Sequence, residues 1–178
     1  MAKQLKEAES HIRFCLEIYG MQIAGKRHFV HEHPDKSRAW RMPEMVKFMA
    51  RPEVGSTVCH MCPFGMTSED TAGRGLVHKA TRITSSADEV LRRMNVRCSN
   101  EHSEMKHRHV HLEHGRARQA QVYSRRFCLR ICEGIAAQRK KEELGLISRP
   151  LMSLEDMSSV AKSAPGECPG AALHEADG

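Results

Sequence analysis

Aromatic side chains are scarce in this sequence. Only 4% of its 178 residues are Phe, Trp or Tyr, with one Trp and two Tyr among them. With so few aromatic rings the core is expected to rest on Leu, Ile, Val, Met and Cys, which pack adaptably but specify one arrangement less sharply. Stacking of bases on a series of aromatic side chains, as in many proteins that bind single-stranded nucleic acid, is also poorly supported.

Long apolar runs are absent as well. No segment approaches the ~20 apolar residues of a membrane helix, and the N-terminal sequence MAKQLKEAESHIRF lacks the apolar centre of a secretory signal. The seven cysteines are an odd number, so a closed set of disulfides is not expected. These features predict reduced thiols, an intracellular location (cytoplasmic or nuclear) and no membrane partner.

Charge divides the chain into two parts. Residues 1–144 hold 26 Lys and Arg against 17 Asp and Glu, whereas residues 145–178 hold two against five. A basic folded part favours anionic partners such as nucleic acid. We therefore expect a folded segment over 1–144, with a His-rich connector at 98–114, and a disordered acidic tail over 145–178.

Hydrophobic periodicity and turn residues predict helices that alternate with strands. The predicted helices cover residues 3–24, 43–52, 86–94 and 116–144, the third of them opened by a capping-box pattern. The predicted strands cover residues 27–31, 56–61 and 77–85. An exposed loop is expected at 62–76. This order predicts an α/β or α+β fold, in which amphipathic helices pack on a small mixed sheet of about three strands, incomplete relative to a full doubly wound domain.

The strongest functional signal lies at the end of the first predicted strand. The apolar residues Phe29 and Val30 run directly into His31-Glu32-His33-Pro34. Ionisable groups at a strand end are where α/β folds commonly place chemistry. The carboxylate of Glu32 can accept a hydrogen bond from the exocyclic amine of a base. The alternative is a solvated glutamate beside two surface histidines.

Several short motifs follow one another in a specific order. They are Glu32-His33-Pro34, then Trp40 and Pro43, then Cys62-Pro63-Phe64-Gly65, and finally Lys79-Ala80-Thr81. This series, within about residues 10–137, resembles the later half of S-adenosylmethionine-dependent methyltransferase-like domains of the cytosine-5 type. It also looks like a stretch of retrotransposon-related polyproteins and their uncharacterised relatives. The resemblance implies that Glu32 is a vestigial catalytic residue that holds the base, with His33, Pro34 and Lys79 at the substrate.

Three parts of that family's site are missing. No glycine-rich turn precedes Arg27, so no backbone N–H groups are offered to the cofactor. No Pro-Cys nucleophile is present, because Cys15 lies within the first predicted helix and Cys59 within the second predicted strand. Position 33 is His where the family usually has Asn. The sequence therefore predicts a catalytically incomplete segment of a mobile-element-related protein that associates with nucleic acid or other polyprotein domains and is not an enzyme as an isolated chain.

A second hypothesis is a zinc-stabilised binding module without enzymatic activity. Cys59 and Cys62 form a C-x2-C pair, which Cys98 and His102 can complete to the Cys3His set that tetrahedral zinc accepts. The alternative for Cys59 is ordinary core packing, since a free cysteine behaves as a small apolar residue. Apart from zinc, no cofactor is expected.

The His-rich connector offers further ligands. On a strand His107, His109 and His111 would share one face, and on a helix His107, His111 and His114 would do so. Either set suits Zn, Ni or Cu without selecting one. We favour the alternative of a solvated polar connector, because dense His tracts often bind metal only adventitiously.

The last candidates are basic residues and a cysteine pair. Guanidinium groups bind phosphates with two parallel hydrogen bonds. The candidate phosphate contacts are Arg92, Arg93, Arg116, Arg118, Arg125 and Arg126, and the alternative is a solvated surface with a small excess of arginine. Cys128 and Cys132 are expected on one helix face, as core packing.

Overall fold

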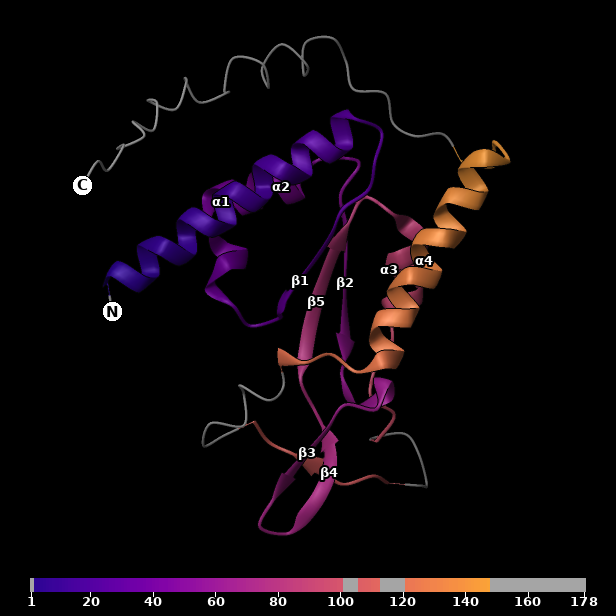
Figure 1. The fold of residues 1–178 in the computed structure, drawn as a ribbon. Helices are drawn as coiled ribbons and strands as arrows, with labels where there is room; N and C mark the ends of the chain where they lie inside the picture. Colours follow the sequence, from indigo (N-terminus) through magenta and orange to yellow (C-terminus); the bar gives the residue numbers. More distant parts are fainter. Residues whose placement is uncertain (1, 101–105, 113–120, 148–178) are drawn as a thin grey trace, which may run out of the picture.

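A three-stranded antiparallel sheet lies at the centre of the fold, with helices on both of its faces (Figure 1). The computed structural model describes residues 2–100, 106–112 and 121–147. The α-helices in this part of the chain are α1 (Ala2–Ala24), α2 (Pro43–Met49), α3 (Asp88–Met94) and α4 (Arg125–Glu143). The strands are β1 (Val30–Pro34), β2 (Gly55–His60), β3 (Thr67–Asp70), β4 (Gly73–Val77), β5 (Ala80–Ser85) and β6 (His109–Val110). Two 3₁₀ turns complete the set, η1 (Arg38–Arg41) and η2 (Cys62–Phe64).

The central sheet has the strand order β1-β5-β2, and both pairings are antiparallel. β5 is the middle strand and is covered on both faces, because Thr81 and Ile83 on one face and Thr84 on the other are almost completely buried. On β1 the side chains alternate, which places Val30 and Glu32 on one face and His31 and His33 on the other. This alternation decides which groups can meet at any site built on the sheet.

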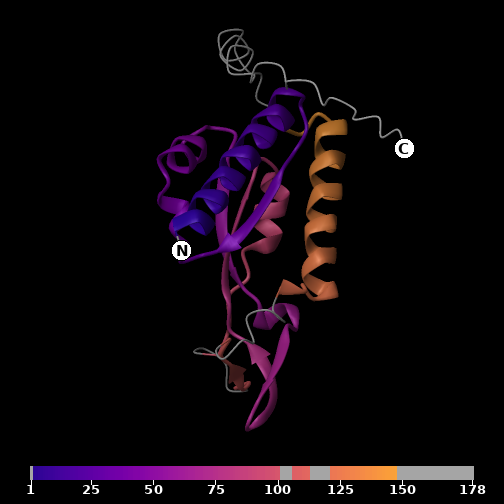
Figure 2. The same cartoon turned by 60° about the vertical axis from the view of Figure 1, so that its left-hand side comes forward.

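Each face of the sheet carries its own core, beneath the helices that cover that face in Figure 2. On the α1 and α2 side, Ile12 and Leu16 of α1 pack with Phe29, Trp40 and Phe48. On the α3 and α4 side the buried cluster is Cys59, Met61, Phe64, Met66, Val77, Ile83, Ala87, Val90, Met94 and Phe127. The second cluster extends beyond the central sheet to β4, and so joins the two sheets of the molecule.

A second three-stranded sheet, in the order β3-β4-β6, extends from one end of the first. β3 and β4 form an antiparallel hairpin, and β6 pairs in parallel with β4 through Leu76↔His109 and Val77↔Val110. The guanidinium of Arg108 donates to both carboxylate oxygens of Asp70 at 2.9 and 2.8 Å, which ties β6 to the hairpin.

The expected fold class is confirmed, but the single sheet is corrected to two. The segment 62–76 was expected to be an exposed loop, and that prediction is wrong because most of it forms η2 and the β3–β4 hairpin. β3 is polar, and only its Ser68 is buried, so it carries almost no hydrophobic signal. β3 therefore forms a strand because it pairs with the more apolar β4, and not because of its own composition.

Several element boundaries differ from the prediction, and the predicted strand 77–85 is divided, because Val77 ends β4 and β5 starts at Ala80. The first strand covers Val30–Pro34, because its pairing with β5 continues to Pro34↔Thr81, and Glu32 therefore lies inside the strand. The expected capping box is not formed, since Ser86 Oγ lies 3.2 Å from Nδ1 of His28 and α3 starts after Ala87. The last helix begins at Arg125, where Ser124 Oγ accepts a hydrogen bond from the N–H of Phe127.

Two further expectations concern the tail with the connector, and the absence of a membrane helix. The predicted tail lies outside the described residues from position 148 onward, as do positions 101–105 and 113–114 of the connector. Among the helices that the structure describes, none combines the length and the apolar character needed to cross a bilayer.

Candidate metal centre

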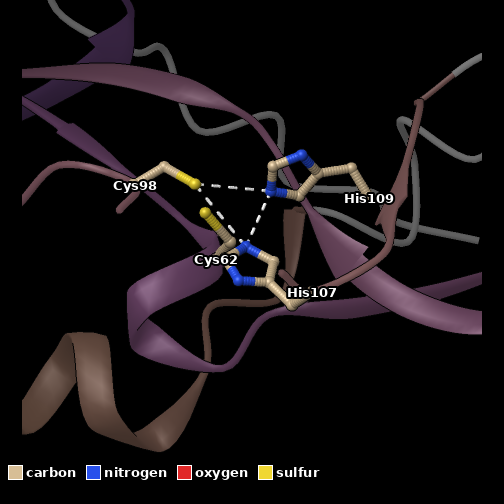
Figure 3. Close-up of side chains that lie close together, drawn as sticks. All are labelled: Cys62, Cys98, His107 and His109. Atoms are coloured by element: carbon tan, nitrogen blue, oxygen red, sulfur yellow. Dashed lines mark hydrogen bonds between the residues drawn. The ribbon is translucent and has the colours of Figure 1, made fainter. Parts of the chain in front are cut away.

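Two thiols and two imidazoles converge where the second sheet meets the core (Figure 3). Cys62 is the first residue of η2, Cys98 follows α3, His107 lies two residues before β6, and His109 is the first residue of β6. Their ligand atoms all lie within 4.8 Å of one another. These four residues, which we name the Cys2His2 cluster, can hold a metal ion.

Two of the three distances among Cys98, His107 and His109 match a tetrahedral ion. Sγ of Cys98 lies 3.5 Å from Nε2 of His107 and 3.5 Å from Nε2 of His109. Zinc bonds of about 2.3 Å to sulfur and 2.0 Å to nitrogen at tetrahedral angles separate these atom types by about 3.5 Å. The two Nε2 atoms are 2.8 Å apart. An ion would separate them to about 3.3 Å.

Local backbone geometry positions the side chains of Cys62, His107 and His109. Pro63 suits the first turn of η2, and Gly65 ends that turn with a φ of 74°, a left-handed value that favours glycine. His107 and His109 are two positions apart in extended chain, which turns both rings to the same side. Their Nε2 atoms therefore approach Cys98 together.

Residues around the cluster hold its ligands in place. The backbone N–H of Cys98 donates to Nδ1 of His60 at 3.0 Å. The side chain of Asn100 brackets His107, accepting from its N–H at 2.8 Å and donating to its carbonyl at 2.9 Å. The N–H of Asn100 also donates to Sγ of Cys98 at 3.4 Å. Such outer contacts fix the orientation of metal ligands.

Burial is the main cause of the pKa shifts of Cys62 and His109. Burial raises the pKa of the Cys62 thiol to about 12, with further contributions from the hydrogen bond and charge of Cys98. Burial lowers the pKa of His109, and repulsion from His78 adds to this. A neutral imidazole is the form that ligates a metal, whereas a thiol must lose its proton to do so.

The structure brings together two of the four predicted zinc ligands, Cys62 and Cys98. Cys59 lies in the hydrophobic core with no exposed surface, because alternation along β2 turns it inward, and His102 lies outside the described residues. His107 and His109 share one face, as expected for a strand. His111 is exposed and is not part of the Cys2His2 cluster.

Glu32, the predicted base-holding residue, is bonded within the fold. Its Oε1 accepts from Oγ1 of Thr81 at 3.0 Å and lies 3.6 Å from Nζ of Lys79, and its Oε2 accepts from the hydroxyl of Tyr123. The side chain is only 16% exposed. The structure thus does bring Glu32 and Lys79 together, as an interior contact between β1, β5 and the segment before α4.

The other predicted substrate residues lie elsewhere. His33 points to the opposite face of the sheet, where its ring meets Trp40 edge to face at 5.9 Å, and burial lowers its pKa. The carbonyl of Pro34 accepts from Nε1 of Trp40 at 2.8 Å. Trp40 therefore anchors η1 to β1. The sheet itself separates His33 from Glu32.

The predicted phosphate contacts are distributed over two helices. Arg92 pairs with Glu89 at 2.7 Å, and Arg93 with Glu133 at 3.7 Å. Arg125 and Arg126 are exposed in the first turn of α4, and Arg116 and Arg118 lie outside the described residues. Cys128 and Cys132 are exposed as well, so the expectation that they pack in the core is wrong. They follow the outer face of α4, whereas Phe127 and Gly134 lie on its inner face.

No protein-family model, curated protein or solved structure matches the chain. The resemblance to cytosine-5-type methyltransferases therefore stays a prediction from the sequence.

Proposed function

We propose that this chain is a zinc-stabilised Cys/His binding module without enzymatic chemistry of its own. A single zinc ion, held by the Cys2His2 cluster, would fasten the β3-β4-β6 sheet to the rest of the fold. The observation that carries the proposal is the convergence of four donor atoms, from three separate segments of chain, within 4.8 Å.

The donor set favours zinc among the common metal ions. Zinc in structural sites takes thiolate and imidazole ligands in a tetrahedral arrangement, whereas calcium and magnesium require oxygen ligands. Four protein ligands leave no open position for water or substrate. A closed site of this kind stabilises a fold and does not activate a nucleophile.

The second sheet is the part of the fold that needs such an ion. β6 contributes only two residues, and β3 buries little apolar surface. A short, polar sheet of this size is marginal without further support. An ion shared by η2, the segment after α3 and β6 supplies that support, because its binding free energy adds to the folding free energy.

No second function is proposed at the Glu32 site. Both carboxylate oxygens already accept hydrogen bonds from Thr81 and Tyr123, so a base would have to displace an interior contact. Removing one partner of a buried polar pair typically costs about 1–3 kcal/mol.

Metal content and thermal unfolding of the full chain test the proposal. We expect one zinc per chain and a concentration-dependent rise in Tm with zinc, reversed by a chelator. Cys98→Ser should weaken zinc binding more than about 100-fold, since it removes a ligand outright. Cys132→Ser is the matched control, because that thiol is exposed on α4 and outside the cluster. Equal zinc affinity in both variants, or no zinc in the wild-type chain, would overturn the proposal.

A further inference from the structure

A hollow of about 290 Å³ lies immediately beside the Cys2His2 cluster, between η2, the segment after α3, and α4. Its apolar lining consists of Pro63, Phe64, Val96 and Leu129. Leu129 is 41% exposed, an unusual position for a leucine on a helix with a well-defined inner face. The hollow therefore combines apolar lining with access from solvent.

The charged lining of the hollow is positive on balance. Arg126 is exposed, and within the part of the chain that the structure describes it has neither a hydrogen bond nor an ion pair. Its δ-carbon lies 3.9 Å from the position that a Cβ at Gly65 would occupy, so the side chain crosses the end of η2. Glu133 is paired with both Arg130 at 3.6 Å and Arg93 at 3.7 Å. Arg126 is thus available to an incoming anion.

We propose that this hollow binds a linear peptide segment that carries an aliphatic side chain next to a carboxylate. The aliphatic side chain would fill the space between Val96 and Leu129, and the carboxylate would pair with the guanidinium of Arg126. Apolar anchors in small pockets supply most of the energy of such contacts. A charge-assisted pair with arginine then fixes the direction of the segment.

The lining favours a peptide over a nucleic acid. Sequence-tolerant binding of single strands depends on exposed aromatic faces. The ring of Phe64 is only 4% exposed and packs edge to face on Phe127, with 5.4 Å between the ring centroids. The carboxylate of Glu133 at one end of the hollow also disfavours a continuous phosphate backbone.

The hollow and the Cys2His2 cluster share their supporting backbone. Pro63 and Phe64 follow the ligand Cys62, and Val96 precedes the ligand Cys98 by two residues. Oγ of Ser124 donates to the carbonyl of Phe64 at 2.7 Å, which fixes the start of α4 against η2. The proposed peptide site goes beyond the proposed zinc module, and it depends on the metal only through the placement of this backbone.

Selection from a random dodecapeptide display library on the full, zinc-loaded chain tests the inference. We expect the selected sequences to pair an aliphatic residue with Asp or Glu within two positions. For a labelled peptide of the selected sequence, Arg126→Glu should weaken binding about 10- to 100-fold, the equivalent of a charge-assisted hydrogen bond. Arg139→Glu makes the same charge change on the same helix, at an exposed position beyond the hollow, and should change affinity less than about twofold.

Four results would overturn the inference. Three of them are a library that yields no binder, selected sequences without the aliphatic–acidic pair, and equal effects of Arg126→Glu and Arg139→Glu. Competition by a 20-nucleotide single strand of dT that is lost in Arg126→Glu would also overturn it, in favour of nucleic acid. Zinc content is measured on the same samples. A zinc-loaded chain without peptide binding contradicts only the inference, and Arg126-dependent peptide binding without zinc contradicts only the proposed function.

Discussion

The backbone N–H of Cys98 donates a hydrogen bond to Nδ1 of His60 across 3.0 Å. Because this nitrogen is an acceptor, the contact of 3.2 Å between it and Nε2 of His78 has His78 as the donor. The ring of His78 in turn stacks on His109, with 4.7 Å between centroids. A chain of three contacts therefore connects two members of the Cys2His2 cluster through residues that are not ligands.

The contact between His60 and Cys98 gives the first prediction. His60→Ala should weaken zinc binding about 10- to 100-fold without changing the stoichiometry, because it frees the backbone at Cys98 but removes no ligand. His60→Asn should recover part of the loss, since its carbonyl oxygen can accept from the same N–H. Competition with a chromophoric chelator measures both effects. Unchanged affinity in His60→Ala would show that the contact does not position the ligand, and complete loss of zinc would show that His60 is itself a ligand.

Two helical glycines give a second prediction, with effects of opposite sign. A Cβ at Gly134 would lie 2.8 Å from Cα of Val90, where α4 crosses α3. Gly134→Ala should therefore lower the free energy of unfolding by about 1–3 kcal/mol despite a better helix propensity. A Cβ added at Gly20 in α1 would have no atom of the described residues within 4 Å beyond its own stretch of helix, so Gly20→Ala should raise the free energy of unfolding by about 0.5–1 kcal/mol. Urea denaturation of both variants checks the signs, and a stabilised Gly134→Ala would contradict the close packing of α3 on α4.

The buried histidine on the α1 side gives a pH prediction. His31 is 7% exposed, its Nδ1 lies 3.0 Å from the hydroxyl of Tyr19, and its buried Nε2 has no partner among the described residues. Burial, with repulsion from His33, lowers the pKa of His31 to about 4. In the unfolded chain His31 has the usual histidine pKa of about 6.5, so between pH 4 and pH 6.5 the unfolded chain binds the proton more readily than the folded chain. Stability should fall as the pH falls from about 6.5 to about 4.

The variant His31→Phe isolates this effect. It keeps an aromatic ring at this position but removes the titrating imidazole, so the difference in unfolding free energy between pH 7 and pH 4.5 should shrink by up to roughly 3 kcal/mol relative to wild type. Release of zinc at low pH affects both chains alike and cancels in the comparison. Parallel pH profiles of the two chains would show that His31 does not titrate with a lowered pKa.

Much of the helical structure was predictable from the sequence, and the second sheet was not. The period of apolar residues defines α1, and Pro43 marks the start of α2. β2 differs from its predicted range by one residue at each end. β3 and β6 could not be found, because one is polar and the other has two residues, and their pairing with β4 depends on contacts distant in sequence.

The candidate site was half predictable. Cys62 and Cys98 were found by residue type, but the short C-x2-C spacing selected Cys59 as a partner. Alternation along β2 decides against Cys59, because it turns that thiol into the core. The H-x-H pattern at His107 and His109 indicates the other two ligands. The sequence favours a solvated connector there, because no local feature shows that β6 pairs with β4 and so lies close to η2.

X-ray absorption at the zinc edge of the full, stoichiometrically loaded chain tests the central claim most directly. The Cys2His2 cluster predicts two sulfur neighbours at about 2.3 Å and two nitrogen neighbours at about 2.0 Å. In Cys98→Ser, any zinc that still binds should have one sulfur neighbour. A wild-type shell with three sulfurs would contradict the account and restore Cys59 as a ligand, and a shell without sulfur would contradict a zinc site at Cys62 and Cys98 altogether.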